Sequence, residues 1–156
     1  MEFRDNHEMP GHLARRFQQI AVAIFHAEIS AAGFDLTPVQ YAALAAIYRN
    51  PCIDHATLSG LIAYDRTSIT GVIDRLVQKE LILSRVHPRD RRAREVAISD
   101  GGRKVLRDII PAVEAAQTKL LRGLEPDEAV IFMRLMKKAI NACNELSRAP
   151  LRVEGG

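Results

Sequence analysis

The sequence predicts a mainly α-helical protein with one small β-hairpin wing. Three observations support this class: apolar residues recur with a helical period in several long segments, a Thr-Pro-Val-Gln helix start lies at residues 37–40, and two runs of period two flank HPRDRRA. We expect the 156 residues to form a single domain. Within it, we expect residues 37–98 to form a winged helix-turn-helix lobe, and residues 10–36 and 99–148 to form a helical dimerisation region.

The first two helices are predicted by apolar spacing and by residues that favour helix starts. A 3.6-residue apolar period predicts a helix over residues 10–32. Thr37 and Gln40 are spaced as a capping box, and Pro38 suits the first turn of the same helix. Since Pro51 disfavours helical geometry in the residue before it, the second helix is expected to end there.

The middle of the chain predicts two more helices and a hairpin. Asp54 is placed to cap a short third helix, and Asp65 to cap the next one, RTSITGVIDRLVQKE. After it, LILSRVH and REVAIS alternate as strands do and are joined by an arginine-rich turn. Two final helices follow, the first capped by Ser99 and bent at Pro111.

Two helices joined by a short turn and followed by a basic hairpin form the layout of a winged helix-turn-helix. In such a module the second helix enters the major groove, and the hairpin reaches an adjacent minor groove. Small polar and arginine side chains suit these positions because they reach base edges and phosphates. A solvated, functionless loop is the alternative for the arginines. The predicted DNA contacts are Arg66, Thr67, Ser68, Thr70, Arg75, Arg89, Arg91 and Arg92.

LTPVQYAALAAI, DRTSITGVIDRLVQKELI and HPRDRRAREVAISDGGRKVL, in this order, resemble the MarR family of bacterial regulators over residues 10–146. The resemblance includes the wing signature Asp90-Arg91-Arg92-Ala93 and the recognition-helix ending Asp74-Arg75-Leu76. It implies a homodimer on a palindromic operator in double-stranded DNA. It also implies that Asp74 and Asp90 support the wing, with Asp74 paired to Arg92. Glu80 departs from the family, which usually has Gly at this position. The resemblance therefore does not decide at which residue that helix ends.

An intertwined homodimer is also expected from the lengths of the terminal helices. On so small a domain, these helices expose more apolar surface than one winged module can cover, which favours a partner. The alternative is a compact monomer whose terminal helices fold back on its own core.

The resemblance further implies release from DNA by a small anionic aromatic compound. His12, Arg16 and Gln19 share one edge of the first helix, where a cation, an imidazole and an amide could hold a carboxylate and a ring substituent. The alternative is a solvated helix edge whose arginine extends over the core to reach water. Tyr41 is a further candidate, although a core tyrosine is the simpler interpretation. MPGHLARRFQQIAVAIF is similar to the start of regulators of aromatic-acid and nicotinate degradation. The predicted function is therefore a repressor of a catabolic operon.

Other classes of function find little support in the sequence. No catalytic, dinucleotide or phosphate-loop motif is present, which predicts a protein that is not an enzyme and needs no cofactor. The histidines show no metal-ligand spacing. Cys52 and Cys143 indicate buried thiols in the cytoplasm, and no apolar run spans a membrane. A redox-responsive regulator using Cys52 and a helical protein-interaction module remain as alternatives.

Overall fold

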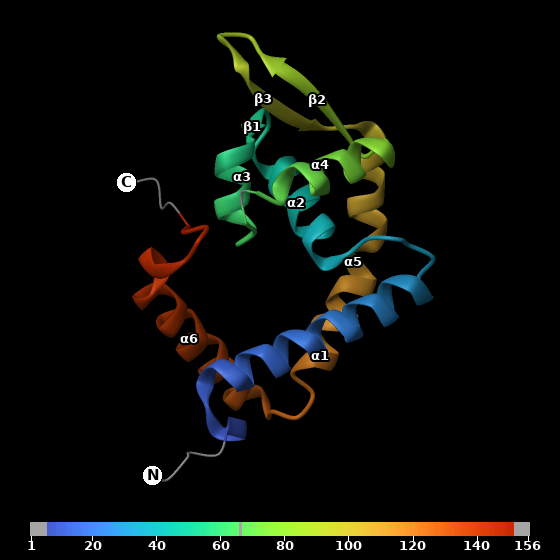
Figure 1. The fold of residues 1–156 in the computed structure, drawn as a ribbon. Coiled ribbons are helices and arrows are strands. Elements are labelled where there is room, and N and C mark those ends of the chain that lie inside the picture. Colours follow the sequence, from blue (N-terminus) through green and yellow to red (C-terminus); the bar gives the residue numbers. More distant parts are fainter. Residues whose placement is uncertain (1–5, 66, 152–156) are drawn as a thin grey trace.

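The chain forms a compact lobe that carries a hairpin and is connected to an open arrangement of three long helices (Figure 1). The computed structural model describes residues 6–65 and 67–151. The helices are η1 (Asn6–Glu8), α1 (Pro10–Ala31), α2 (Pro38–Arg49), α3 (His55–Leu61), α4 (Ile69–Gln78), α5 (Asp100–Leu120), α6 (Pro126–Ala142) and η2 (Asn144–Leu146). The strands are β1 (Ile53–Asp54), β2 (Ile82–His87) and β3 (Asp90–Ile98).

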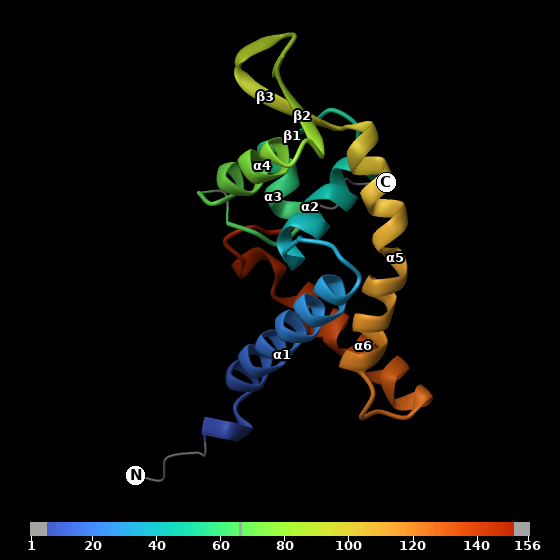
Figure 2. The ribbon, with the colours of Figure 1, turned by 90° about the vertical axis from the view of Figure 1, so that its right-hand side faces the viewer.

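The three strands form one antiparallel sheet in the order β1-β3-β2. Ile53 of β1 lies opposite Val96 of β3, and Ile82 of β2 lies opposite Ile98. These apolar pairs face the core of the lobe, where all four side chains are buried. The outer part of the β2–β3 hairpin extends beyond the lobe as a wing (Figures 1 and 2).

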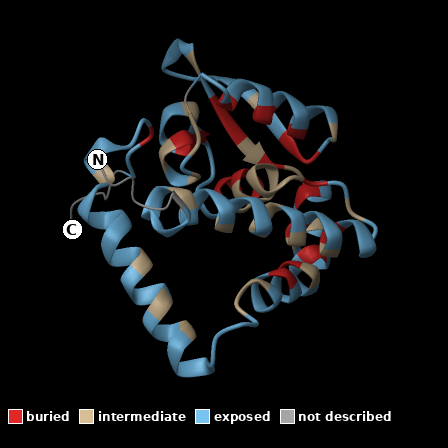
Figure 3. Cartoon of the chain, turned by 60° about the horizontal axis from the view of Figure 1, so that its bottom comes forward, coloured by how far each residue is buried: buried red, intermediate tan, exposed pale blue. Residues whose placement is uncertain are grey.

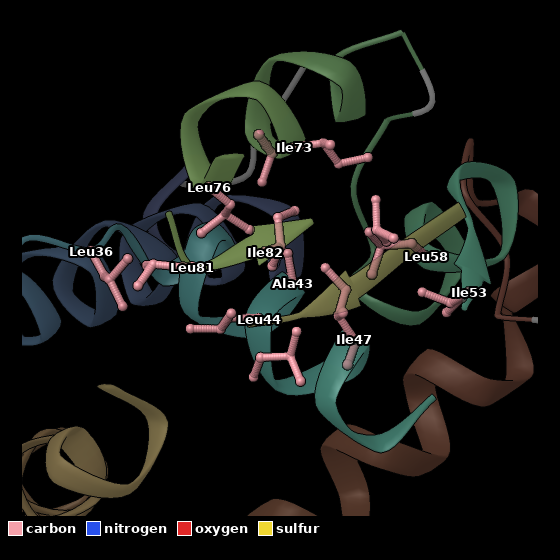
Figure 4. Close-up of a cluster of buried hydrophobic side chains, with 14 of the residues drawn as sticks. Leu36, Ala43, Leu44, Ile47, Ile53, Leu58, Ile73, Leu76, Leu81 and Ile82 are labelled. Atoms are coloured by element: carbon pink, nitrogen blue, oxygen red, sulfur yellow. The ribbon is translucent and has the colours of Figure 1, made fainter. Parts of the chain in front are cut away.

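The lobe core is built from α2, α3, α4 and the sheet (Figure 4). Leu44 and Ile47 of α2 contribute inaccessible side chains, as do Leu58 of α3 and Leu76 of α4. The apolar stripe predicted for the recognition helix is confirmed, since Ile69, Val72, Ile73 and Leu76 are all buried. The stripe fixes α4 with its opposite, polar face toward solvent, because a helix buries only the side that carries its apolar residues.

The long helices at the ends of the chain are less well covered. Phe25 and Ile29 of α1 are buried, as are Ile109 and Val113 of α5, and Lys119 of α5 pairs with Glu28 of α1 at 2.7 Å. In contrast, no residue of α6 is buried among those described. The helix nearest the C-terminus in Figure 3 is accordingly exposed along its length, with apolar as well as polar side chains.

The predicted helix starts are mostly confirmed. Thr37 accepts a hydrogen bond from the Gln40 backbone N–H at 3.2 Å, and its own N–H donates to the Gln40 side chain, which completes the capping box. Asp54 accepts from the Thr57 N–H at 2.8 Å, and Ser99 accepts from the Gly102 N–H at 2.9 Å. Each side chain satisfies a backbone donor that the first helical turn leaves unpaired.

Three expectations about local structure are wrong. Asp65 does not cap α4: its backbone carbonyl accepts the Ser68 N–H at 3.0 Å, and the helix begins at Ile69 with Ser68 at the N-cap position. The hairpin turn is shorter than predicted, because β3 already begins at Asp90. Both cysteines are exposed rather than buried, since Cys52 lies in a turn and Cys143 follows the uncovered helix α6.

Candidate functional site

The polar face of α4 is the first part of the candidate nucleic-acid interface. Thr67 and Ser68 precede the helix, Thr70 and Arg75 lie on it, and all four are exposed. Ser68 makes no side-chain capping hydrogen bond, so its hydroxyl is not used by the helix end. The predicted contact Arg66 lies outside the described residues. Hydroxyl groups at a helix start, together with unpaired backbone N–H groups, suit contacts with phosphate oxygens.

The wing is the second part of the interface. Arg89, Arg91 and Arg92 are exposed on the hairpin that extends from the lobe, as is Asp90. One carboxylate oxygen of Asp90 accepts the Arg92 backbone N–H at 2.9 Å, and the Arg89 N–H donates to Nδ1 of His87 at 3.2 Å. These bonds shape the tip through the backbone and leave the three guanidinium groups without an ion pair among the described residues.

The ion pair implied between Asp74 and Arg92 is not formed within the described part of the chain. Regular pairing of the hairpin ends at Val86 opposite Arg94, and the ladder then shifts to His87 opposite Asp90. Residues 91–93 therefore lie in an irregular outer segment of β3, beyond the paired base of the hairpin that adjoins α4. The expected ion pair between Asp74 and Arg92 is therefore wrong for this structure. A role of Asp74 in supporting the wing remains a prediction.

The base of the wing is held by a different pair, Arg85 with Glu95. They lie opposite each other on β2 and β3, and the guanidinium Nε of Arg85 donates to Glu95, which is only 4% exposed. Nη2 of Arg85 also contacts Sγ of Cys52 at 3.2 Å, which links the wing to the turn before β1. A buried carboxylate needs such a partner, because desolvation of an unpaired charge is costly.

His55 lies where α3, α4 and the wing meet. Its Nε2 atom is buried without a hydrogen-bond partner. Burial lowers the pKa of His55, and the positive charge of Arg94 lowers it further, while Asp54 and Asp74 act in the opposite direction. The neutral imidazole of His55 is thus favoured at this place.

The predicted effector residues do not lie in one cavity. Arg16 lines an apolar hollow between α1 and α6, together with Phe17 and Phe132, whose rings are 5.5 Å apart. His12 stacks edge-on against His7 at 5.1 Å, and burial, followed by the charge of Arg16, lowers its pKa. Gln19 is exposed on α1 and is not among the residues lining that hollow.

Tyr41 lies instead in a separate cavity between α2 and α5, of about 480 Å³. Four polar residues of this cavity were not predicted from the sequence: Tyr48, Arg49, Arg103 and Arg107. Their helical spacing shows which of them share a face of one helix, since Tyr48 is seven residues after Tyr41, and Arg107 four after Arg103. Spacing within a helix cannot show that two helices turn these faces toward each other.

The described residues hold no group of three or more His, Cys, Asp or Glu side chains that could bind a metal ion. None of the described helices is both long and apolar enough to cross a membrane.

Similarity to known proteins agrees with this geometry. A family model described as the MarR family matches residues 36–93. The transcriptional repressor NicR of Pseudomonas putida is 30% identical over 135 residues, or 86% of this chain and 84% of NicR. Among solved structures, BpsR of Bordetella bronchiseptica has a TM-score of 0.82 at 28% identity, covering 90% of this chain and 99% of BpsR. PcaV of Streptomyces coelicolor, in complex with its natural ligand, has a TM-score of 0.81 at 28% identity, covering 92% of this chain and 99% of PcaV.

An exposed polar helix beside an arginine-bearing hairpin, both fixed to one small core, defines a winged helix-turn-helix protein. The matched segment contains α4 and the wing arginines. The chain belongs to the MarR family and is a transcriptional regulator. These relatives are regulators of transcription rather than enzymes, in agreement with the sequence-based prediction.

Proposed function

We propose that this protein is a cytoplasmic homodimeric repressor of a catabolic operon, which binds a palindromic operator and is released by a small aromatic acid. The observation that carries the proposal is the juxtaposition of the exposed α4 face and the wing arginines at one end of the molecule (Figure 1). Repression and release by an aromatic acid are suggested by the names of the relatives. NicR is named as a repressor, and the BpsR structure concerns regulation of its DNA binding by 6-hydroxynicotinic acid.

The dimer is supported by the uncovered helix α6. Val130, Leu135 and Ile140 are 68%, 50% and 59% exposed, and Leu13 and Ile20 of α1 are also exposed. So much exposed apolar surface on the terminal helices of a small protein favours burial against a second chain. Two recognition helices in a two-fold dimer could read half-sites one DNA turn apart, about 34–36 Å. Light scattering of the wild type and of Leu135→Glu tests this point: we expect a dimer and a weakened or monomeric variant.

Operator binding is tested with DNA from immediately upstream of the gene that encodes the protein. We expect retardation of this fragment in excess random duplex, with an affinity that falls as salt rises because bound phosphates release counterions. Arg92→Ala should weaken binding and reduce the salt slope by about one unit. Arg122→Ala, which removes an exposed arginine after α5, is the matched control. Equal binding of operator and random DNA would contradict the proposal.

Release is tested with the same complex and a panel of hydroxybenzoates, hydroxycinnamates and hydroxynicotinates. We propose that a carboxylate is bound by Arg16 on α1 with help from His12 and Gln19, and that binding favours a dimer whose recognition helices no longer match the half-sites. Arg16→Ala should then keep operator affinity and lose the response. Normal release of this variant would show that the α1 edge does not bind the effector.

A second candidate switch is oxidation of Cys52, favoured by its exposure and by its contact with Arg85 at the base of the wing. The Cys52 thiolate would attack one oxygen of hydrogen peroxide, the O–O bond would break, and the products would be a sulfenic acid at Cys52 and hydroxide, which takes up a proton to give water. Loss of operator binding after mild hydrogen peroxide treatment, prevented by Cys52→Ser, would support it. An unchanged affinity after treatment would exclude this switch.

A further inference from the structure

The chain returns to the helix-turn-helix lobe after α6. Residues 147–151, which we call the strap, follow η2 and lie beside α3, the helix that precedes the recognition helix α4 (Figures 1 and 2). The lobe is already joined to the long helices where α1 leads into α2 and where β3 leads into α5. The strap adds a further connection, from the end of α6 to α3.

Hydrogen bonds within the end of the chain give the strap a defined shape. The Asn144 side chain donates through Nδ2 to the Leu151 carbonyl at 2.9 Å, and its Oδ1 accepts the Leu151 backbone N–H at 2.8 Å. The Ala149 N–H donates to Oγ of Ser147 at 3.1 Å. Because one planar amide binds both backbone groups of Leu151, it holds the far end of the strap against η2.

One face of α3 receives the strap. Ala56, Thr57, Gly60 and Leu61 share this face by their helical spacing, and together with the strap they line a small hollow. Ala149 lies in this contact and is only 8% exposed. A buried side chain so near the end of the chain indicates that the strap packs on the lobe.

Gly60 allows the backbone of the strap to approach α3 closely. A Cβ at this position would lie 3.1 Å from the carbonyl oxygen of Pro150. Glycine is unfavourable inside a helix, because it has more conformational freedom to lose on folding than alanine. The close approach of the strap supplies a physical reason for glycine in a helix as short as α3.

The strap also reaches the residue that leads into the recognition helix. Nη1 of Arg148 lies 3.4 Å from Oδ2 of Asp65, whose carbonyl accepts the Ser68 N–H just before α4. The Arg148 side chain is 90% exposed, so this ion pair adds little stability by itself. It nevertheless places the strap against the segment between α3 and α4.

From these contacts we infer that the strap positions the recognition helix relative to α6. A lobe held at α3 as well as at its junction with α5 has less freedom to turn about that junction. In a two-fold dimer built on the long helices, the orientation of each lobe sets the separation of the two recognition helices. The effect on DNA rests on the proposed function, whereas the attachment of the strap to α3 does not.

Hydrogen exchange of the full chain tests the attachment without DNA. We expect Ala149→Asp to speed exchange of the α3 amides by about tenfold or more, because a charge replaces a methyl group buried against a short helix. Asn144→Ala, which removes both bonds to Leu151, should have the same effect to a smaller degree. Ala142→Asp makes the same chemical change as Ala149→Asp at an exposed residue of α6 and should leave α3 unchanged.

Operators of altered spacing test the effect on DNA. One base pair inserted between the half-sites rotates one against the other by roughly 35°. The wild type should lose affinity for this operator by about tenfold or more, and Ala149→Asp should reduce that ratio at least about threefold, because a loosened lobe accepts both spacings. The ratio compares two operators with one protein, so the added charge affects both affinities alike. Ala142→Asp should keep the wild-type ratio.

Two results would overturn the inference. Unchanged exchange of α3 in both Ala149→Asp and Asn144→Ala would show that the strap is not attached to the lobe. Faster exchange with an unchanged spacing ratio would reject its positioning role. If the wild type binds no operator specifically, the proposed function fails and the effect on DNA with it, while faster exchange of α3 in the two variants would still support the attachment.

Discussion

Arg85 on β2 and Glu95 on β3 form an ion pair across the base of the wing. The carboxylate side is buried, with only 6% of the Glu95 side chain exposed, whereas the Arg85 side chain is 64% exposed. The pair thus neutralises a charge inside the sheet with a cation that remains partly in water. Since the hairpin carries the wing arginines, this pair fixes the base from which they extend.

Removing Arg85 should destabilise the lobe. We expect Arg85→Ala to lower the free energy of unfolding, because Glu95 is left buried without its cation. The loss should be smaller than that of a fully buried pair, since the Arg85 side chain is largely exposed. Urea denaturation measures the change. Arg91→Ala at the exposed wing tip is the control and should be within about 0.5 kcal/mol of the wild type. Equal stability of the two variants would mean that Glu95 does not depend on Arg85.

Glu80 is a site where a glycine should stabilise the protein. It has φ of 57° after the end of α4, a left-handed conformation, and its carbonyl accepts a hydrogen bond from the Ser99 hydroxyl at 2.6 Å. Glycine adopts this conformation without the steric cost of Cβ, although it adds entropy to the unfolded chain. We expect Glu80→Gly to raise stability by about 0.5 kcal/mol in thermal or urea unfolding. Glu80→Ala keeps the strain, so a similar gain there would contradict this reason.

Gly102 should not tolerate a side chain. A Cβ at this position would lie 2.1 Å from the carbonyl oxygen of Leu81 and 2.8 Å from Cγ1 of Ile98, at the junction of α5 with the sheet. Gly102→Ala should therefore lower stability by about 2 kcal/mol or more. At neighbouring Gly101 the nearest such contact is 3.4 Å, so Gly101→Ala should be neutral or slightly stabilising. Calorimetry compares the melting temperatures of the two variants. Equal values would show that the backbone where α5 meets the sheet shifts to accommodate the added methyl group.

Stability should fall as the solution becomes mildly acidic, because of His55. Its pKa is lowered from 6.5, first by burial and then by Arg94, so the unfolded chain takes up a proton before the folded protein does. This contribution is intact above pH 6.5 and is lost as pH falls from there through the lowered pKa of the folded state. His55→Gln should flatten the dependence of melting temperature on pH over this interval. An equally steep dependence in the variant would assign it to other groups.

Much of the fold could be predicted from the sequence because its signals are local. The capping box of Thr37 and Gln40, the cap Asp54 and the apolar stripe of α4 each depend on residues within one or two helical turns. Two predictions were wrong because they depended on more than such local signals. Asp65 has the chemistry of a cap, but a turn delays the helix to Ile69, and the two-residue hairpin turn depends on pairing between strands.

The candidate interface and the cavities also combine features that local sequence signals predict with features that only the packing of the chain decides. The sequence by itself determined the order of recognition helix and wing and the placement of Thr70, Arg75 and the wing arginines on them, because helical period and strand alternation decide which residues share a face. Only the tertiary structure decided that Glu95 is buried against Arg85, that Tyr41 lies apart from Arg16, and that arginines of α2 and α5 enclose one cavity. Those relationships depend on the packing of segments distant in the chain, which no local pattern specifies.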